Sequence, residues 1–182
     1  MTNEQARRIV AQLNGRTQVE AFEAAKAIWQ DSDKSLERPL ISTLRSGRRP
    51  FNRAAAAHAM QIVKTPKIIR ALERTLANKS EYPRVRGEAA EALAHGHRKG
   101  SHDVLLQGLG DPGKNVRFWC AFALGEMAER RAIDILKGLV ATDKRVVRGF
   151  HSIAKEAADA LNNIDAAKKD WRKGGCAFCV RD

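Results

Sequence analysis

The sequence predicts an all-α fold, a right-handed solenoid of stacked antiparallel helix pairs. The main observation is a set of leucines that recur at intervals of 31 to 33 residues: Leu40, Leu72, Leu105 and Leu136. Small residues form columns in the same register, one of which is Ala25, Ala57, Ala90 and Ala121. A fixed period of this size is typical of repeat proteins, in which each unit buries its apolar face against the next unit.

The first two predicted units each contain a helix A followed by a helix B. In the first unit helix A runs from Thr17 to Trp29 and helix B from Leu36 to Ser46, where Gly47 ends it. Glycine is favoured just beyond a helix C-terminus because it adopts the left-handed conformation without strain. In the second unit the helices span residues 50–63 and 67–78, and helix A begins with a proline, which is favoured in the first turn.

The third and fourth units repeat this arrangement. The third has helix A over residues 83–95 and helix B over 101–109, separated by a turn bounded by two glycines. The fourth starts after Asp111 and a proline, its helix A ends near Glu129, and its helix B covers residues 130–141. The prolines at the start of helix A again mark the beginning of each unit.

Both ends of the array are predicted to be caps. Residues 3–13 match a lone helix B, and residues 146–164 match one more helix A, so four complete units occupy about 16–142. Terminal units of solenoids are usually atypical because one of their faces meets solvent. The sequence therefore predicts a repeat domain over 1–164, followed by a basic C-terminal tail over 165–182.

The charge composition favours acidic proteins or other polyanions as binding partners. The chain holds 33 Lys+Arg against 21 Asp+Glu, which gives a net charge of +12 and a pI near 10.1. Such an excess favours acidic proteins or nucleic acids as partners. The sequence has no apolar run long enough for a membrane span and no signal-peptide pattern, so we expect a cytoplasmic protein without a membrane partner.

One segment of the fourth unit resembles a known repeat family. Residues 111–117 read Asp-Pro-Gly-Lys-Asn-Val-Arg, and Ala121, Ala123, Leu124 and Gly125 follow. This resembles the D-x-x-x-x-V-R…A-x-A-L-G pattern of HEAT repeats, particularly the short variety named after the phycobilisome lyases. The resemblance covers roughly Ala6 to Ile164 and implies a solenoid whose B helices line a concave side.

An arginine column lies at the start of successive A helices: Arg53, Arg86 and Arg117. The resemblance implies a structural role for this column, because in HEAT-like repeats the arginine pairs with the aspartate six residues earlier and joins adjacent units. Here that pair is Asp111 with Arg117, whereas Gly47 and Ser80 occupy the aspartate position before the other two arginines. Arginine suits such partly desolvated pairs because its planar guanidinium binds carboxylates in a fixed geometry. An anion-binding site is the alternative.

A second arginine set lies on the B helices and is the predicted partner-binding surface: Arg7, Arg38, Arg45, Arg70 and Arg74. Three of them precede the core leucine column by two residues, which is about 200° around a helix, so they face away from the core. In later units this column becomes acidic, at Asp103 and Asp134. The alternative is an ordinary solvated polar face.

The tail carries two cysteines, Cys176 and Cys179, at the spacing of half a zinc site. Because the tail offers no further ligands, an exposed or partner-facing segment is favoured over a metal or redox role. No histidine in the chain is followed by glutamate, whereas the HEAT-repeat iron enzyme that hydroxylates deoxyhypusine uses such pairs. We therefore predict no metal and no cofactor.

These observations favour a non-catalytic binding protein, such as an adaptor, an inhibitor or an immunity factor. Its expected partner is an acidic protein, held on the basic concave face. Nucleic acid is the alternative partner, because the net charge also suits phosphate contacts. An enzyme, glycosylase-like or lyase-like, ranks third because the sequence contains no P-loop, Rossmann glycine pattern or nucleophile elbow, and no catalytic residue is assigned.

Overall fold

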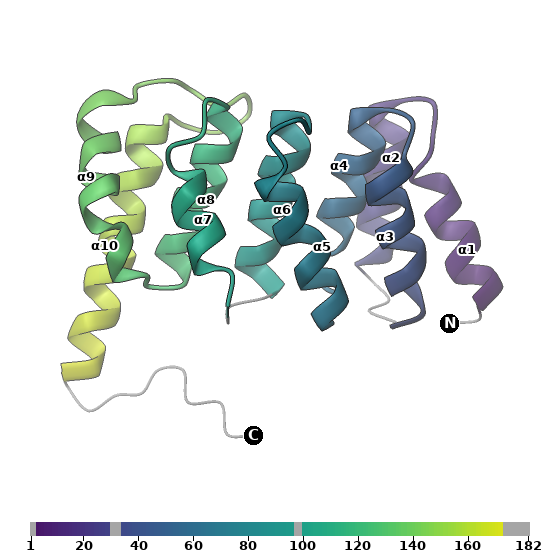
Figure 1. The fold of residues 1–182 in the computed structure, drawn as a ribbon, viewed down its shortest axis with the longest axis horizontal. Helices are drawn as coiled ribbons and strands as arrows, with labels where there is room; N and C mark the ends of the chain where they lie inside the picture. Colours follow the sequence, from purple (N-terminus) through teal and green to yellow (C-terminus); the bar gives the residue numbers. More distant parts are fainter. Residues whose placement is uncertain (1–2, 30–33, 97–99, 173–182) are drawn as a thin grey trace.

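The described chain folds into two layers of stacked helices. The computed structural model describes residues 3–29, 34–96 and 100–172. Within these ranges it contains ten α-helices, no strand, and one isolated β-bridge between Val146 and Ser152. The helices stand side by side in a row, with α1 at one end of the row and α9 and α10 at the other (Figure 1). This architecture confirms the predicted all-α stack of helix pairs.

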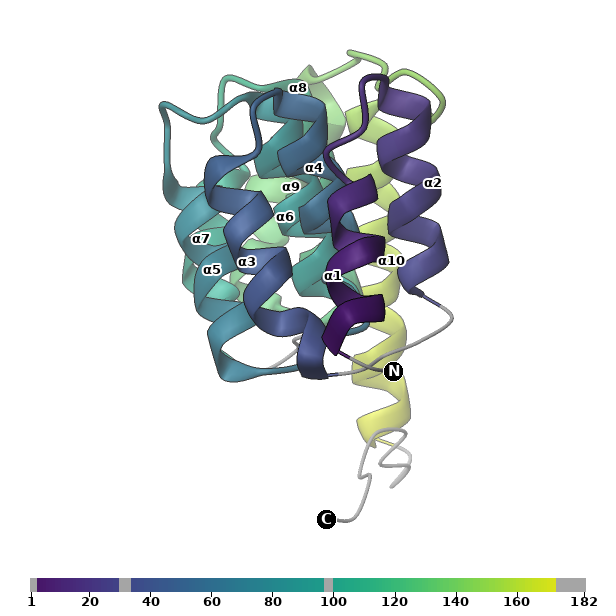
Figure 2. The ribbon, with the colours of Figure 1, turned by 90° about the vertical axis from the view of Figure 1, so that its right-hand side faces the viewer.

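Each helix pair contributes one helix to each layer, as the side view shows (Figure 2). The A layer contains α2 (Gln18–Ile28), α4 (Pro50–Ala59), α6 (Pro83–Gly96), α8 (Lys114–Glu126) and α10 (Ile153–Arg172). The B layer contains α3 (Glu37–Ser46), α5 (Pro66–Ala77), α7 (His102–Gly108) and α9 (Ile133–Thr142). Single 3-10 turns, Lys34–Leu36 and Arg130–Ala132, precede α3 and α9. Helix α1 (Asn3–Gln12) covers the first pair.

The alanine columns determine how closely the A layer packs. Four consecutive alanines of α4, Ala54 to Ala57, are completely buried, as are Ala89 and Ala90 of α6 and Ala121 of α8. Small side chains allow helix backbones to approach closely. Consecutive helices of the A layer accordingly pack tightly from α2 to α10, whereas neighbouring helices of the B layer lie further apart. This difference opens space between adjacent B helices.

The leucine register predicted from the sequence is confirmed. Leu40, Leu72, Leu105 and Leu136 are all fully buried, each on the inner side of its B helix. Helix starts follow local chemistry: in α2 the Thr17 side chain accepts a hydrogen bond from the Glu20 amide at 3.2 Å, completing a capping box. Local caps and the apolar period therefore favour the same helices.

Several helix bounds differ from the predicted ones, most of all at the C-terminus. The helix expected over 146–164 begins at Ile153 and continues to Arg172. Its start is delayed because Gly149 turns the chain with a φ of 85° and the Ser152 hydroxyl accepts from the Lys155 amide at 3.2 Å, a cap at that point. Residues 165–172, predicted to belong to the tail, continue the helix because alanine, lysine and arginine favour it. Cys176 and Cys179 lie outside the described residues.

Other bounds also differ, and helix A of the fourth unit, expected to end near Glu129, ends at Glu126. Helix A of the second unit, expected to reach residue 63, ends at Ala59, and the chain leaves it through a turn. In the fourth unit the α-helix of the expected 130–141 segment starts only at Ile133, because the preceding 3-10 turn is held by the Glu129 carboxylate, which accepts from the Arg131 amide at 3.0 Å. Residues that satisfy free amides at a helix start determine where the helix begins.

Gly125 lies so close to the last helix that a larger residue there should destabilise the protein. A Cβ on Gly125 of α8 would lie 2.7 Å from the Ala160 Cα of α10, so Gly125→Ala must push these helices apart. We expect it to lower the free energy of unfolding by about 1–3 kcal/mol, measured by urea denaturation. Gly138→Ala is the matched control, because a Cβ there meets nothing within 4 Å and should stabilise α9 by about 0.5–1 kcal/mol. Equal effects at the two sites would contradict the close α8–α10 contact.

Candidate binding groove

The B layer contains a basic groove between α3 and α5, with a volume of about 570 Å³. Four of the five arginines predicted to bind a partner line it: Arg38 and Arg45 from α3, and Arg70 and Arg74 from α5. All four side chains are exposed. Consecutive A helices pack closely through their alanines, whereas consecutive B helices lie further apart. The groove occupies the space between two of these B helices.

The floor of the groove is apolar and its walls are cationic. Ile41 of α3 and the buried Ala71 of α5 lie between the arginines. At one end Lys67 pairs with Glu37 at 3.0 Å, so this lysine and carboxylate largely neutralise each other. Among the described residues, no carboxylate lies within ion-pair distance of any of the four arginines. Within the part of the chain that the structure describes, the groove therefore presents four arginines outside any ion pair around an apolar strip.

A smaller hollow of about 210 Å³ extends the groove toward the loop after α5. It shares Arg45, Ala71 and Arg74 with the groove and adds Asn78 and Glu81. The Glu81 carboxylate is already paired with Arg53, which is 18% exposed. A bound segment that ran along the groove would therefore meet polar groups at this end rather than another free cation.

The fifth predicted arginine lies outside this groove. Arg7 is exposed on α1 and does not line the groove, so its part in partner binding stays a prediction. Helix α1 packs against α2 and α3 at the end of the stack. In the later units Asp103 pairs with Arg131 at 2.8 Å and Asp134 lies 3.7 Å from Lys137.

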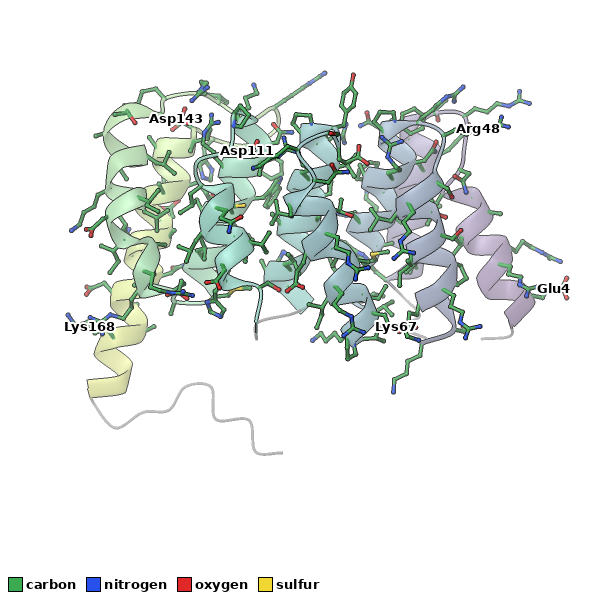
Figure 3. All side chains as sticks on the ribbon, viewed as in Figure 1. Glu4, Arg48, Lys67, Asp111, Asp143 and Lys168 are labelled. Carbon is green, nitrogen blue, oxygen red and sulfur yellow. The ribbon has the colours of Figure 1, made fainter. Side chains whose placement is uncertain are left out.

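The arginines of the A helices form a ladder of ion pairs between units. Arg53 binds both Glu81 oxygens, at 2.7 and 2.8 Å. Arg86 pairs with Asp111, and the Arg117 Nε donates to Asp143 at 2.8 Å. Asp111 and Asp143 lie along one edge of the stack, and Lys67 lies at the opposite edge (Figure 3). Each arginine thus reaches the loop that begins the next unit.

The pairing within this ladder differs from the predicted one. Arg117 does not bind the Asp111 carboxylate; it donates to the Asp111 backbone carbonyl. The carboxylate instead accepts from Arg86, from Lys79 at 2.7 Å and from the Gly113 amide at 2.8 Å. Burial raises the pKa of Asp111, but these hydrogen bonds outweigh burial and lower it to about 2. In the sequence, a carboxylate follows each of these arginines by 25 to 28 residues. That spacing is the signal from which the observed pairing could have been predicted.

A further polar cluster, which the sequence analysis did not identify, lies in the A layer. His58 of α4 has its Nδ1 3.1 Å from Glu88 and 3.8 Å from Glu91, one turn apart on α6. The Trp29 ring lies against the imidazole, with centroids 4.7 Å apart. Burial lowers the pKa of His58, but hydrogen bonds to Glu88 and Glu91 more than offset it and raise the value to about 9. Gln61 completes the cluster, 3.1 Å from the same Nδ1.

Comparison with known proteins identifies the repeat and the fold. A family model described as HEAT repeats matches residues 6–94 and 76–154. Among solved structures, a chain from the complex of CpcE and CpcF of phycocyanin lyase from Nostoc sp. PCC7120 is similar, with a TM-score of 0.69 and 17% identity. The match covers 88% of this chain and 98% of that chain. No curated protein matches, and no described helix is long and apolar enough to cross a membrane.

Proposed function

The chain belongs to the HEAT-repeat family, and we propose that it is a non-catalytic binding protein whose α3–α5 groove takes an acidic segment of a partner protein. The observation that carries this proposal is the set of four arginines without carboxylate partners among the described residues, gathered around one groove. HEAT repeats offer an extended surface for other proteins. We also propose a cytoplasmic location.

The chemistry of the groove supports binding rather than catalysis. Its charged side chains are mostly arginines, such as Arg38 and Arg70, and guanidinium groups stay protonated and supply no general base. They do bind carboxylates in a planar, two-bond geometry. An adaptor, an inhibitor or an immunity factor would use such a groove in the same way.

An apolar strip between the arginines supports a protein partner over nucleic acid. Ile41 and Ala71 offer a surface for aliphatic side chains that alternate with carboxylates in a peptide. The similar CpcE–CpcF structure is a complex of two proteins, which is a further argument for a protein partner. Nucleic acid remains the second candidate because the net charge of +12 suits phosphate contacts.

Charge reversal in the groove tests this function. In the variant Arg38→Glu/Arg70→Glu, we expect binding of a fluorescein-labelled peptide of alternating glutamate and leucine to weaken by at least about 30-fold, because two favourable contacts become repulsive. Fluorescence anisotropy measures the affinity, and circular dichroism with thermal melting confirms the fold. Both arginines are exposed, so the fold should persist.

The matched control changes the same net charge outside the groove. Arg130→Glu/Arg148→Glu reverses two exposed arginines that do not line the groove, and the peptide affinity should change by less than about threefold. Equal losses in the two variants would show a net-charge effect and contradict the groove. If a short DNA duplex binds more tightly than the peptide, and the groove variant flattens its log affinity against log salt by about 0.9 per lost phosphate contact, the partner is nucleic acid.

A further inference from the structure

The cluster of His58, Glu88 and Glu91 brings three metal-binding side chains to one point between two repeat units. One nitrogen and two carboxylate oxygens of these residues lie within 4.8 Å of one another. The side chains are 15%, 12% and 13% exposed, respectively, so they are held in the protein rather than spread over its surface. They belong to the A layer, whereas the arginine groove lies in the B layer.

The spacing of these atoms is close to that of a bound transition metal. Ligands about 2.1 Å from a tetrahedral Zn²⁺ lie about 3.4 Å from one another. The His58 Nδ1 lies 3.1 Å from the Glu88 Oε2 and 3.8 Å from the Glu91 Oε2, on either side of that value. Side-chain shifts of less than about 1 Å would therefore let all three atoms reach one ion.

We propose that His58, Glu88 and Glu91 form a binding site for a divalent transition-metal ion, of which Zn²⁺ is the probe. The set of one imidazole and two carboxylates is a three-ligand set of the kind that leaves a fourth zinc position open. Gln61 lies against the same imidazole nitrogen at 3.1 Å, and a half-turn of its amide would direct its carbonyl oxygen toward the ion. The ion would join α4 to α6.

Neighbouring side chains hold the ligands in place. Trp29 lies against the imidazole and its Nε1 donates to the His58 carbonyl at 3.3 Å. Arg84 lies over the Phe22 ring and 3.8 Å from the Glu88 Oε1, which is not the oxygen that faces His58. Such outer contacts orient metal ligands and tune their affinity. Arg84 also adds a positive charge nearby, which opposes cation binding, but it contacts the far oxygen of the carboxylate.

An adjoining hollow offers the ion a way in. It has a volume of about 640 Å³ and is lined by Trp29, Gln61, Ile62, Lys64, Glu91 and His95. Gln61 and Glu91 therefore belong both to the cluster and to the hollow. The open coordination position would face this space, whose lining includes Lys64 and also His95, which could donate a further nitrogen.

Ligand type defines the selectivity among divalent ions. Within the cluster two carboxylates face one imidazolium, with Arg84 against the outer oxygen of Glu88, and a divalent ion bound by a neutral imidazole would supply one more positive charge than the imidazolium does. Imidazole nitrogen favours Zn²⁺ and Co²⁺, while Mg²⁺ and Ca²⁺ prefer oxygen ligands alone. We therefore expect tight binding of Zn²⁺ and Co²⁺ and weak binding of Mg²⁺ and Ca²⁺.

Calorimetric titration of the whole 182-residue chain with zinc chloride tests the proposal. The protein carries Cys176→Ser and Cys179→Ser, which remove the competing thiols of the tail. We expect one Zn²⁺ per chain with a dissociation constant of about 1 µM or below, and a rise in melting temperature with Zn²⁺ concentration. Co²⁺ should give a visible absorption band that indicates nitrogen and oxygen ligands without thiolate.

Glutamine substitutions identify the ligands. Glu91→Gln should weaken Zn²⁺ binding by at least about 30-fold, and Glu88→Gln serves as a second variant in case one of the two fails to fold. Glu126→Gln, at an exposed carboxylate of α8, is the matched control and should bind like the parent. The proposal is wrong if the parent binds Zn²⁺ more weakly than about 100 µM, or if folded Glu91→Gln and Glu88→Gln proteins bind as tightly as the parent. Zn²⁺ binding that is seen only in the protein that retains Cys176 and Cys179 also overturns it.

Discussion

Asp111→Asn is expected to lower the free energy of unfolding by about 3–5 kcal/mol, because it removes the charge that a buried guanidinium requires. Arg86 and Asp111 are each only 2% exposed. Asparagine keeps the shape of the side chain and can still accept from the Gly113 amide, which donates to Asp111 at 2.8 Å. It cannot compensate the charge of Arg86, so the loss should come from electrostatics rather than from packing. Urea denaturation measures it.

The control for this variant is an exposed ion pair of similar chemistry. Asp103 pairs with Arg131 at 2.8 Å, but its side chain is 80% exposed. Asp103→Asn should therefore change the free energy of unfolding by less than about 1 kcal/mol, since water screens such pairs. A loss at Asp111 no larger than the loss at Asp103 would contradict the role of the ladder in joining the units.

The acid dependence of stability provides a second measurement on the same pair. Because the pKa of Asp111 is lowered to about 2 in the folded protein, its ion pair contributes fully above the unfolded-state pKa of about 3.9. The contribution, of about 2–3 kcal/mol, is lost as the pH falls from there through the folded value. In Asp111→Asn this part of the acid-induced loss should be missing, and an unchanged acid profile would contradict the assignment.

The fold could be predicted because its determinants recur in the sequence. Each buried column, such as Leu72 and Leu105 in the B helices or Ala57 and Ala90 in the A helices, depends only on helix period and repeat spacing. The start of the last helix could not be placed, because it depends on a φ of 85° at Gly149 and on a cap from Ser152. Those are features of one loop and do not repeat.

The candidate site could be predicted only in part. The groove arginines, for example Arg38 and Arg70, follow from the helix face opposite the core leucines. That they gather in one groove depends on the wider spacing of the B helices, which no single residue encodes. The cluster of His58, Glu88 and Glu91 combines side chains 30 or more residues apart without any motif spacing. It becomes visible only once α4 and α6 are packed together.

Leu105→Ala is expected to lower the free energy of unfolding by about 2–5 kcal/mol, the second large effect. Leu105 is fully buried in the core between the two layers, on the short helix α7. Helix α7 has few other apolar anchors: Val104 and Leu106 are only partly buried. The truncation removes apolar contacts and leaves a cavity that the tightly packed alanines of α6 and α8 cannot fill, because their side chains are too short to move into it. Denaturant melts give the free energy directly.

Ile135→Ala is the matched control for this truncation, because it removes a similar volume from an aliphatic side chain of the same layer that is 45% exposed. Its expected cost is below about 1 kcal/mol, since little apolar surface leaves the core. A loss below about 0.5 kcal/mol for Leu105→Ala would place that leucine at the surface and contradict the register of the whole leucine column.

The destabilisation in Leu105→Ala should be concentrated in the third unit. Because stability in stacked repeats is a sum of unit and interface terms, this unit should unfold at the lowest denaturant concentration. Hydrogen exchange of amides in α7 measures this local loss, and uniform acceleration across all helices would indicate instead that the array unfolds as one cooperative unit.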